Sequence, residues 1–523
     1  MGQMHFSVPA SALDFFEASL WQDAYLCGIE GVPWESHNRF ADGRLTLTRG
    51  VDASAKLLVT CPVPTIGMRV LTTCSLRCQE PPHRFIQELA RGSCFRVRVQ
   101  SDTWQRGGLS LSDRFNQLLD EGTLLFLETI QRSLVDEDDP LATQAAIDAI
   151  TKLEQSATEL GNLFSAQSIA FRKSRENRLS TMLAVGMLPP SPSASEEAHP
   201  ADADQLGTDD SANPMTHLVG RSFNAAAVRI SWGDIETDSG KPDYDPVTQS
   251  LDACLGAGLR VIGGPLVDYQ TGLLPDWLTL LEGDFDKLVS TMNQFVEGTV
   301  NQFRSRVNLW NAATSLNTAG PLGLDDEQIM RLSVGVLQTV RRCDPNTPVI
   351  MSLDQPCGEY LAKDQNGISP LHFADALLRS GLGLAGIGLN FRFGYDGGST
   401  HPRSAIEFAQ LIDRWATLGM PLLVQLSVAG APGNDSRSRL PYRPMSLDPS
   451  LNGDPSTWAQ FQCEFAKPLV ETLLAKQIVH AIVWEDWSDA SPHLCAHAGL
   501  HDIQGQPRPM LGYLRKVRDE MLM

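Results

Sequence analysis

Residues 384–428 read LAGIGLNFRFGYDGGSTHPRSAIEFAQLIDRWATLGMPLLVQLSV. The stretch begins with an apolar run at 384–390, continues into an amphipathic segment at 403–418, and ends in a second apolar run at 422–428. Short, nearly continuous apolar runs are typical of parallel strands that are buried on both faces, and the segment between them has helical periodicity. The order strand, helix, strand predicts one repeating unit of a parallel α/β fold.

The same alternation extends over residues 179–523. Six further apolar runs are predicted as strands: Thr181–Leu188, Ala227–Trp232, Leu259–Val267, Val307–Ala312, Val349–Leu353 and His480–Trp484. Amphipathic segments such as Asp325–Arg342 separate these runs. Together with the two runs above they make eight strands, which fits a (β/α)₈ barrel or a doubly wound sheet. No GxGxxG or GxxxxGK[ST] motif follows an early strand, so the pattern does not support nucleotide binding.

The N-terminal third has a different pattern. Short alternating runs at Arg44–Arg49, Lys56–Thr60 and Phe95–Val99 are separated by Gly, Pro and Asp turns. This predicts a β-rich, sandwich-like domain at residues 1–110. Residues 111–178 have apolar positions mostly three or four apart and are predicted as connecting helices. The sandwich is either a glycan-binding domain or a packing domain for the C-terminal fold.

Composition and charge limit the classes of partner. The net charge of −20 argues against a nucleic-acid backbone or an anionic membrane as the main partner. No window approaches 18 uninterrupted apolar residues, and the N-terminus lacks the pattern of a signal peptide. The ten cysteines have no repeated spacing, and Cys74 and Cys78 form a lone CxxxC. We therefore expect a cytoplasmic protein with free thiols, no metal and no cofactor. The sequence identifies no protein partner.

An acidic segment interrupts the pattern after the first predicted strand. Residues 189–214 read PPSPSASEEAHPADADQLGTDDSANP, with six acidic residues, five prolines and almost no large apolar side chain. So little burial cannot offset the entropy cost of ordering, which predicts a disordered insertion, or else an interdomain linker. We expect limited proteolysis to cut here first, and deletion of 191–212 to leave the melting temperature unchanged. A fall of many degrees would show that the segment is packed.

Six short motifs follow one another in the C-terminal part. Residues 232–245 are similar to W-x-x-[LI]-E-P-x-x-G-x-[FY]-[DN]-[FYW], residues 263–267 to G-H-T-L-V-W-H, and residues 274–277 to L-P-x-W. Residues 307–315 are similar to W-D-V-V-N-E, residues 386–390 to G-I-G-L-Q, and residues 499–509 to L-[LF]-D-x-x-x-x-P-[KR]-P. In this order the motifs resemble the family 10 glycoside hydrolases, the xylanases. The resemblance covers residues 218–514 and favours the (β/α)₈ barrel over the doubly wound sheet.

The resemblance does not extend to the family's catalytic carboxylates. Retaining hydrolysis needs an acid/base and a nucleophile about 5–5.5 Å apart, which the family carries after strand four and on strand seven. The acid/base position matches Ser315, and the nucleophile position matches Leu426, or Gln425 with a one-residue shift. No Asp or Glu lies between residues 421 and 434. The family's sugar-holding Asn, Lys and His positions match other residue types: Val228, Ser231, Gly264, Tyr269 and Arg392.

Several polar and aromatic residues are predicted at the carboxyl ends of the strands, where barrel active sites lie. Asp268, Asp354 and Glu485 are candidates for relocated catalytic acids. The alternatives are that Asp354 caps a helix or pairs with Arg392, and that Glu485 is an ordinary loop residue. A ligand-binding role is predicted for eight residues: Trp232, Tyr269, Asn311, Asn390, Arg392, Gln425, Trp484 and Trp487.

Trp484 and Trp487 resemble the family's strand-eight tryptophans, which form a wall against the sugar; core packing is the alternative. Four histidines, His480, His493, His497 and His501, lie close in sequence without a HExxH motif, so no metal is predicted.

Two function classes remain open. One is a xylanase-like pseudoenzyme that binds glycans weakly or acts as a scaffold, and the other is a glycan-active enzyme with relocated acids.

Overall fold

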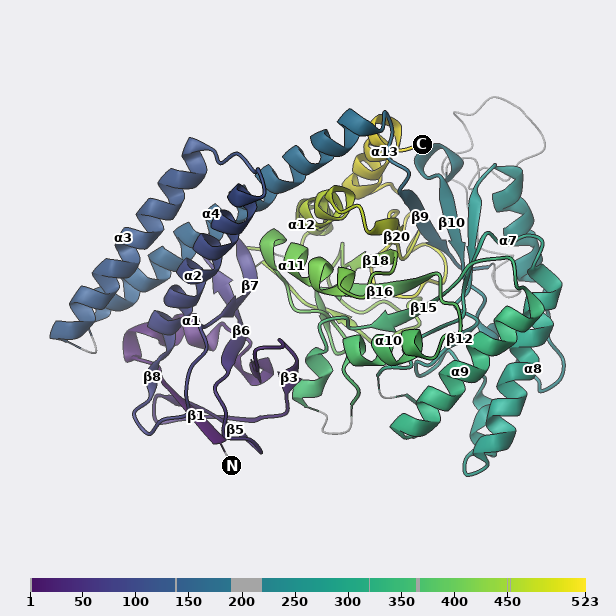
Figure 1. Cartoon of the computed structure of the whole chain (residues 1–523), viewed down its shortest axis with the longest axis horizontal. Coiled ribbons are helices and arrows are strands. Elements are labelled where there is room, and N and C mark those ends of the chain that lie inside the picture. Colours follow the sequence, from purple (N-terminus) through teal and green to yellow (C-terminus); the bar gives the residue numbers. More distant parts are fainter. Residues whose placement is uncertain are drawn as a thin grey trace.

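The computed structural model describes residues 2–136, 139–189, 219–318, 320–363, 367–448, 450–451 and 453–523. Apart from Pro189, the acidic insertion predicted at 189–214 lies outside these residues. In Figure 1 a unit built from the N-terminal sheets and three long helices lies on the left, and a barrel lies on the right. The helix α4 (Pro140–Arg175) runs from the first to the second.

Eight parallel strands form a closed barrel, as the alternating pattern predicts. In chain order they are β9 (Met182–Met187), β10 (Ala225–Val228), β11 (Arg260–Gly263), β13 (Leu309–Asn311), β15 (Val349–Asp354), β16 (Gly386–Phe393), β18 (Leu422–Val428) and β20 (Val479–Trp484). Each strand pairs with the next, and β20 closes on β9. The second strand ends at Val228, four residues before its predicted end, because Trp232 begins the short helix α6 (Trp232–Ile235).

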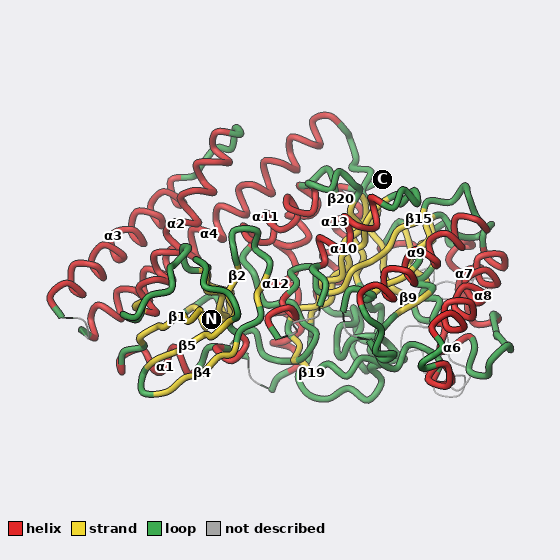
Figure 2. Tube along the Cα trace, turned by 60° about the horizontal axis from the view of Figure 1, so that its bottom comes forward, coloured by secondary structure: helices red, strands yellow, loops and turns green. Residues whose placement is uncertain are grey.

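Helices surround the barrel on the outside (Figure 2). They are α7 (Asp245–Gly256), α8 (Phe285–Phe303), α9 (Asp326–Cys343), α10 (Pro370–Arg379), α11 (Ala405–Ala416), α12 (Pro455–Ala475) and α13 (Pro509–Met521). Two of them begin with a capping box, in which Asp325 and Ser404 accept from the backbone N–H three residues on. Two small sheets lie outside the barrel sheet: β12 (Val267–Asp268) with β14 (Ala313–Thr314), and β17 (Tyr395–Asp396) with β19 (Arg443–Pro444).

The N-terminal unit contains two four-stranded sheets, in the orders β4-β5-β1-β8 and β3-β2-β6-β7. Their strands are β1 (Gly2–Ser7), β2 (Tyr25–Cys27), β3 (Pro33–Trp34), β4 (His37–Ala41), β5 (Arg44–Arg49), β6 (Lys56–Val63), β7 (Gly67–Thr72) and β8 (His83–Arg84). A short helix, α1 (Leu13–Glu17), precedes β2. Residues from both sheets share one apolar core, including Phe6, Leu47, Leu57 and Val59.

One predicted strand is wrong. Residues 95–99 belong to α2 (Phe85–Arg106), so the helical region begins before residue 111. Within this run only Val97 is buried, whereas Phe95 is 57% and Val99 47% exposed. The buried positions of α2 recur with helical period, and the run FRVRV has an alternating pattern only because two large apolar residues lie on the solvent side of a helix.

The helices α2, α3 (Asp113–Val135) and α4 pack side by side, and α4 also packs against the barrel helices α11 and α12. An ion pair joins the layers: Arg96 of α2 contacts Glu154 of α4 and lies 2.9 Å from Glu407 of α11. All three side chains are at least nine-tenths buried. Among the described residues, no helix has both the length and the apolar composition needed to cross a membrane.

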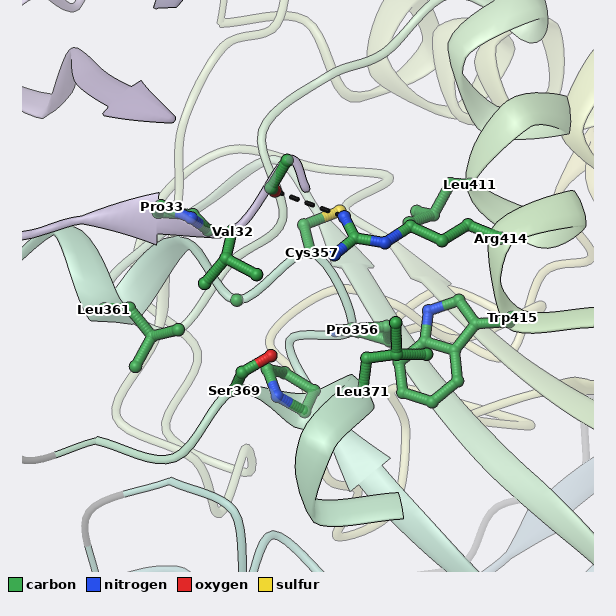
Figure 3. Close-up of a pocket in the computed structure, with 13 residues that line it drawn as sticks. Val32, Pro33, Pro356, Cys357, Leu361, Ser369, Leu371, Leu411, Arg414 and Trp415 are labelled. Atoms are coloured by element: carbon green, nitrogen blue, oxygen red, sulfur yellow. Dashed lines mark hydrogen bonds between the residues drawn. The ribbon is translucent and has the colours of Figure 1, made fainter. Parts of the chain in front are cut away.

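The N-terminal sheets contact the loops at the carboxyl ends of the barrel strands. Backbone N–H groups of Met68 and Val70 donate to the carbonyls of Leu447 (2.6 Å) and Pro402 (2.8 Å). We call this contact surface between the N-terminal sheets and the barrel the seam. Figure 3 shows a second part of the seam, where Arg414 of α11 donates to the carbonyl of Gly31 at 3.2 Å. The void between them is only about 10 Å³. At this place the sheets are therefore closely packed against the barrel.

Candidate functional site at the mouth of the barrel

Three of the predicted site residues form one ion-pair cluster at the mouth. Arg392 of β16 donates from Nε and Nη2 to the two carboxylate oxygens of Glu485, at 3.1 and 3.0 Å. Its Nη1 donates to Asp354 Oδ1 at 2.6 Å. All three side chains are at most 2% exposed. A guanidinium that binds one carboxylate with two parallel hydrogen bonds has nearly ideal geometry for the pair.

Glu485 has two further donors. Gln425 Nε2 donates to Oε1 at 2.6 Å, and the Cys495 thiol donates to Oε2 at 3.4 Å. Burial acts to raise the pKa of Glu485, but Arg392, together with Arg229 and the Cys495 thiol, holds the pKa below its usual range. Burial raises the pKa of Asp354, which has only one bond from Arg392. Arg392 therefore binds Glu485 more strongly than Asp354.

The third candidate acid is also paired with an arginine. Asp268 of β12 contacts Arg229, a residue that follows β10. Burial raises the pKa of Asp268 to about 6, although Arg229 acts in the opposite direction. The other oxygen, Oδ1, is buried without a hydrogen-bond partner among the described residues. Arg229 was not among the predicted site residues, although a charged residue inside the predicted strand Ala227–Trp232 could have indicated it.

The residues predicted from the sequence to stand at the family's catalytic positions, Ser315 and either Leu426 or Gln425, are neutral. The Ser315 hydroxyl accepts from Gln270 Nε2 at 2.8 Å, and the neighbouring Thr314 hydroxyl accepts from Asn390 at 2.8 Å. Leu426 is buried in the core around the barrel, and Gln425 donates to Glu485. None of these groups carries the negative charge near pH 7 that a glycosyl nucleophile needs.

The structure buries all three tryptophans that were predicted to bind a ligand, including Trp484 and Trp487 of the predicted aromatic wall. Trp232 stacks on Phe295 at 4.8 Å and donates to Glu236 at 2.8 Å. Trp484 is 1% exposed and donates to the carbonyl of Ala498 at 2.9 Å. Trp487, 8% exposed, packs edge-on against Phe223. In this structure none of the three rings is exposed for stacking against a sugar.

The remaining predicted residues lie around a small cavity or in the core. Asn311, Gln425 and Glu485 line a mouth cavity of about 30 Å³, which Leu494 also lines. Asn390 lies beside it on β16, and Tyr269 is buried in the apolar core. This volume holds a water molecule or two. Sites for drug-sized ligands are roughly ten times larger.

A larger cleft lies between the N-terminal sheets and the barrel rim. Its volume is about 610 Å³, and polar residues from both units line it, including Gln22, Asn38, Glu359, Asp396 and His401. Thr400, 1% exposed, also lines it, and its hydroxyl has no hydrogen-bond partner among the described residues. The sequence analysis could not find this cleft, because its two walls come from segments more than 300 residues apart.

The four C-terminal histidines separate in space. His480 is exposed on β20, and His501 packs against Trp487 with ring centroids 4.5 Å apart. His493 and His497 instead lie beside Asp435, with Asp489 near His493.

Comparison with known proteins finds sequence and structural relatives of the C-terminal part of the chain. No model of a protein family matches the chain. Endo-1,4-beta-xylanase B of Thermotoga neapolitana is 21% identical over 327 residues, which are 60% of this chain and 85% of the relative. Xylanase 10B of Thermotoga maritima is 16% identical with a TM-score of 0.46, covering 68% of this chain and 97% of that one. Xylanase 10B of Thermotoga petrophila, solved with xylobiose, is 15% identical with a TM-score of 0.44, covering 65% and 94%. The C-terminal part of this chain is a (β/α)₈ barrel similar to the family 10 xylanases.

Proposed function

We propose that this chain is a non-hydrolytic pseudoenzyme, a glycan-binding or scaffolding protein built on a xylanase-like barrel. The observation that carries the proposal is the position of Arg392 between Asp354 and Glu485. A general acid must be protonated and free to reach the glycosidic oxygen, and a nucleophile must direct an unshared oxygen at the anomeric carbon. An arginine that binds both carboxylates leaves neither free for these roles.

The shape of the mouth supports the same proposal. A xylanase-type mechanism holds a sugar ring between the two carboxylates, whereas the mouth cavity is about 30 Å³. Leu494 and Asp486 line it, and Asp486 accepts from the backbone N–H of Leu494 at 2.8 Å and of Cys495 at 3.0 Å. Hydrogen bonds within the loop after β20 thus hold this loop in the position that narrows the mouth.

The scaffolding role rests on the seam between the two units. The N-terminal sheets bind the rim through backbone hydrogen bonds and through Arg403, which donates to Tyr25 at 3.0 Å and to Glu359 at 2.6 Å. The cleft beside this seam has the volume of a ligand site. Polar side chains on both walls can bind sugar hydroxyls, and the buried Thr400 hydroxyl behind them has no hydrogen-bond partner among the described residues. We therefore assign glycan binding to this cleft rather than to the mouth.

The experiment is a hydrolysis assay with the purified full chain. Incubated with xylan, the protein is expected to release reducing sugar no faster than a buffer blank, because the two missing carboxylates each support several orders of magnitude in rate. An active family 10 xylanase at the same concentration is the positive control. Release above the blank that disappears in Glu485→Gln would overturn the proposal.

A titration tests the binding half. Xylo-oligosaccharides are expected to bind with a Kd on the order of 1 mM to 10 µM, and Thr400→Val should weaken this binding severalfold. Thr417→Val, on the exposed end of α11, is the matched control. Binding that Thr400→Val leaves unchanged would place the glycan elsewhere, and no binding to any glycan would leave only the scaffolding role.

One observation favours a glycan-active enzyme as the second candidate. The pKa of Asp268, raised to about 6 by burial, lies in the range that a general acid needs near neutral pH. Its pairing with Arg229 argues against this role. Hydrolysis that is lost in Asp268→Asn and retained in Asp354→Asn would identify Asp268 as a relocated acid and support the second candidate.

A further inference from the structure

A cluster of four ligand-type side chains lies between two loops of the barrel, apart from the Arg392 cluster. Asp435 comes from the loop after β18, and Asp489, His493 and His497 come from the loop after β20. His493 Nε2 lies 2.9 Å from Asp435 Oδ2 and 3.7 Å from Asp489 Oδ1. One atom of each of these three residues lies within 4.8 Å of the other two. Their side chains are at most 4% exposed.

Hydrogen bonds orient these three residues toward one another. His493 Nδ1 lies 2.9 Å from the carbonyl of Ser491, so this nitrogen carries the proton and Nε2 is directed at the carboxylates. The Asp435 carboxylate accepts from the backbone N–H of Arg437 and of His497, and the Asp489 carboxylate accepts from Gly499. An imidazole that donates one N–H to a backbone carbonyl and directs the other nitrogen inward is the usual arrangement of a metal ligand.

His497 supplies an independent observation. Its side chain is 9% exposed, and Nδ1 lies 3.5 Å from Asp435 Oδ2. Neither ring nitrogen makes a hydrogen bond among the described residues. A buried polar group without a partner is costly, and most buried polar groups in folded proteins have one. A ligand between His497 and Asp435 would remove this cost.

We propose that Asp435, Asp489 and His493 form a binding site for a divalent transition-metal ion, with Zn²⁺ as the best fit, and that the ring of His497 turns toward the ion to become a fourth ligand. Imidazole and carboxylate ligands together suit zinc, whereas Ca²⁺ and Mg²⁺ take oxygen ligands almost exclusively. Zinc bonds of about 2.0–2.2 Å place tetrahedral ligand atoms roughly 3.3 Å apart. The three spacings around the cluster, 2.9, 3.5 and 3.7 Å, lie on either side of this value.

The site would hold together the loops that close the mouth. Leu494 and Cys495, which cover the mouth and contact Glu485, lie between His493 and His497 in the chain. An ion bound to both histidines and to Asp435 would fasten this segment to the loop after β18. The role is structural and is independent of whether the barrel hydrolyses or binds a glycan. The competing state has no ion: His493 is protonated and pairs with Asp435, while Arg508, 2.7 Å from Asp489, balances the second carboxylate.

The first experiment measures Zn²⁺ binding to the full, tag-free chain after removal of metals with a chelator. Equilibrium dialysis with elemental analysis is expected to find about one tightly bound ion per chain. His493→Gln and Asp435→Asn should weaken binding at least tenfold. His480→Gln, at the exposed position of β20, and Cys74→Ser, in the CxxxC motif, are the matched controls and should bind like wild type. No bound Zn²⁺, or equal binding by both cluster variants, would overturn the proposal.

A second measurement needs no variant, in case a cluster substitution prevents folding. Co²⁺ added to the metal-free wild type should give the visible absorption of a four- or five-coordinate ion with nitrogen and oxygen ligands. The strong near-ultraviolet band of a cobalt–thiolate bond should be absent, which separates this cluster from the ten free cysteines. A thiolate band, or the weak spectrum of hydrated Co²⁺, would contradict the proposal.

Discussion

Replacing Arg392 by methionine is expected to lower the free energy of unfolding by about 3–5 kcal/mol. Arg392 is the counter-ion of two carboxylates that are at most 2% exposed. Methionine fills much of the space but leaves Asp354 and Glu485 buried beside each other without a cation. Because single domains have only about 5–15 kcal/mol of net stability, this loss is a large part of the total. Guanidinium unfolding followed by tryptophan fluorescence measures it.

Two comparisons identify the cause. Arg379→Met removes an exposed pair with Asp375 and should change the unfolding free energy by less than about 0.5 kcal/mol. In Arg392→Met the pKa values of the two buried carboxyl groups lie above their unfolded-state values, so the lost stability is greatest at neutral pH and shrinks as the pH is lowered and both groups take up protons. An Arg392→Met midpoint equal to wild type at pH 7 would show that the cluster is solvated.

Replacing Gly92 by alanine is expected to destabilise the chain by about 1–3 kcal/mol, toward the upper end of that range. Gly92 lies where α2 crosses β7, and an alanine Cβ there would be 1.8 Å from the Thr72 carbonyl oxygen and 2.8 Å from two further backbone atoms. Backbone atoms cannot rotate away as a side chain can. The helix would have to move off the sheet and leave a gap in the core of the N-terminal unit.

The matched control, Gly512→Ala, is expected to change the stability of the chain in the opposite direction. Gly512 lies in α13, and a Cβ built there meets no atom within 4 Å. Because alanine favours helices over glycine, Gly512→Ala should stabilise the chain by about 0.5–1 kcal/mol. Thermal unfolding of both variants beside wild type compares them directly. If Gly92→Ala also raised the melting temperature, α2 would not pack against β7 as described.

The barrel could be predicted from the sequence because its signal is local. Strands buried on both faces need apolar runs, and helices that cover them need an apolar face, so both patterns can be read from consecutive residues such as 384–428. The prediction that Ser315 and either Leu426 or Gln425 stand at the family's catalytic positions likewise comes from the sequence alone. The error at residues 95–99 occurred where large apolar side chains lie in solvent and local pattern no longer reports burial.

The sequence by itself determined the eight strands, the resemblance to the family 10 xylanases and the absence of a carboxylate on strand seven. Only the tertiary structure decided that Trp484 is buried, that Arg392 joins Asp354 to Glu485, and that Asp435 meets His493. Each of these three results depends on strand ends and loops from different parts of the chain, which meet at one end of the barrel. Closing the sheet into a barrel brings into contact side chains that are 38 to 93 residues apart in the chain. The local periodicity of the sequence does not indicate which of these side chains will be neighbours.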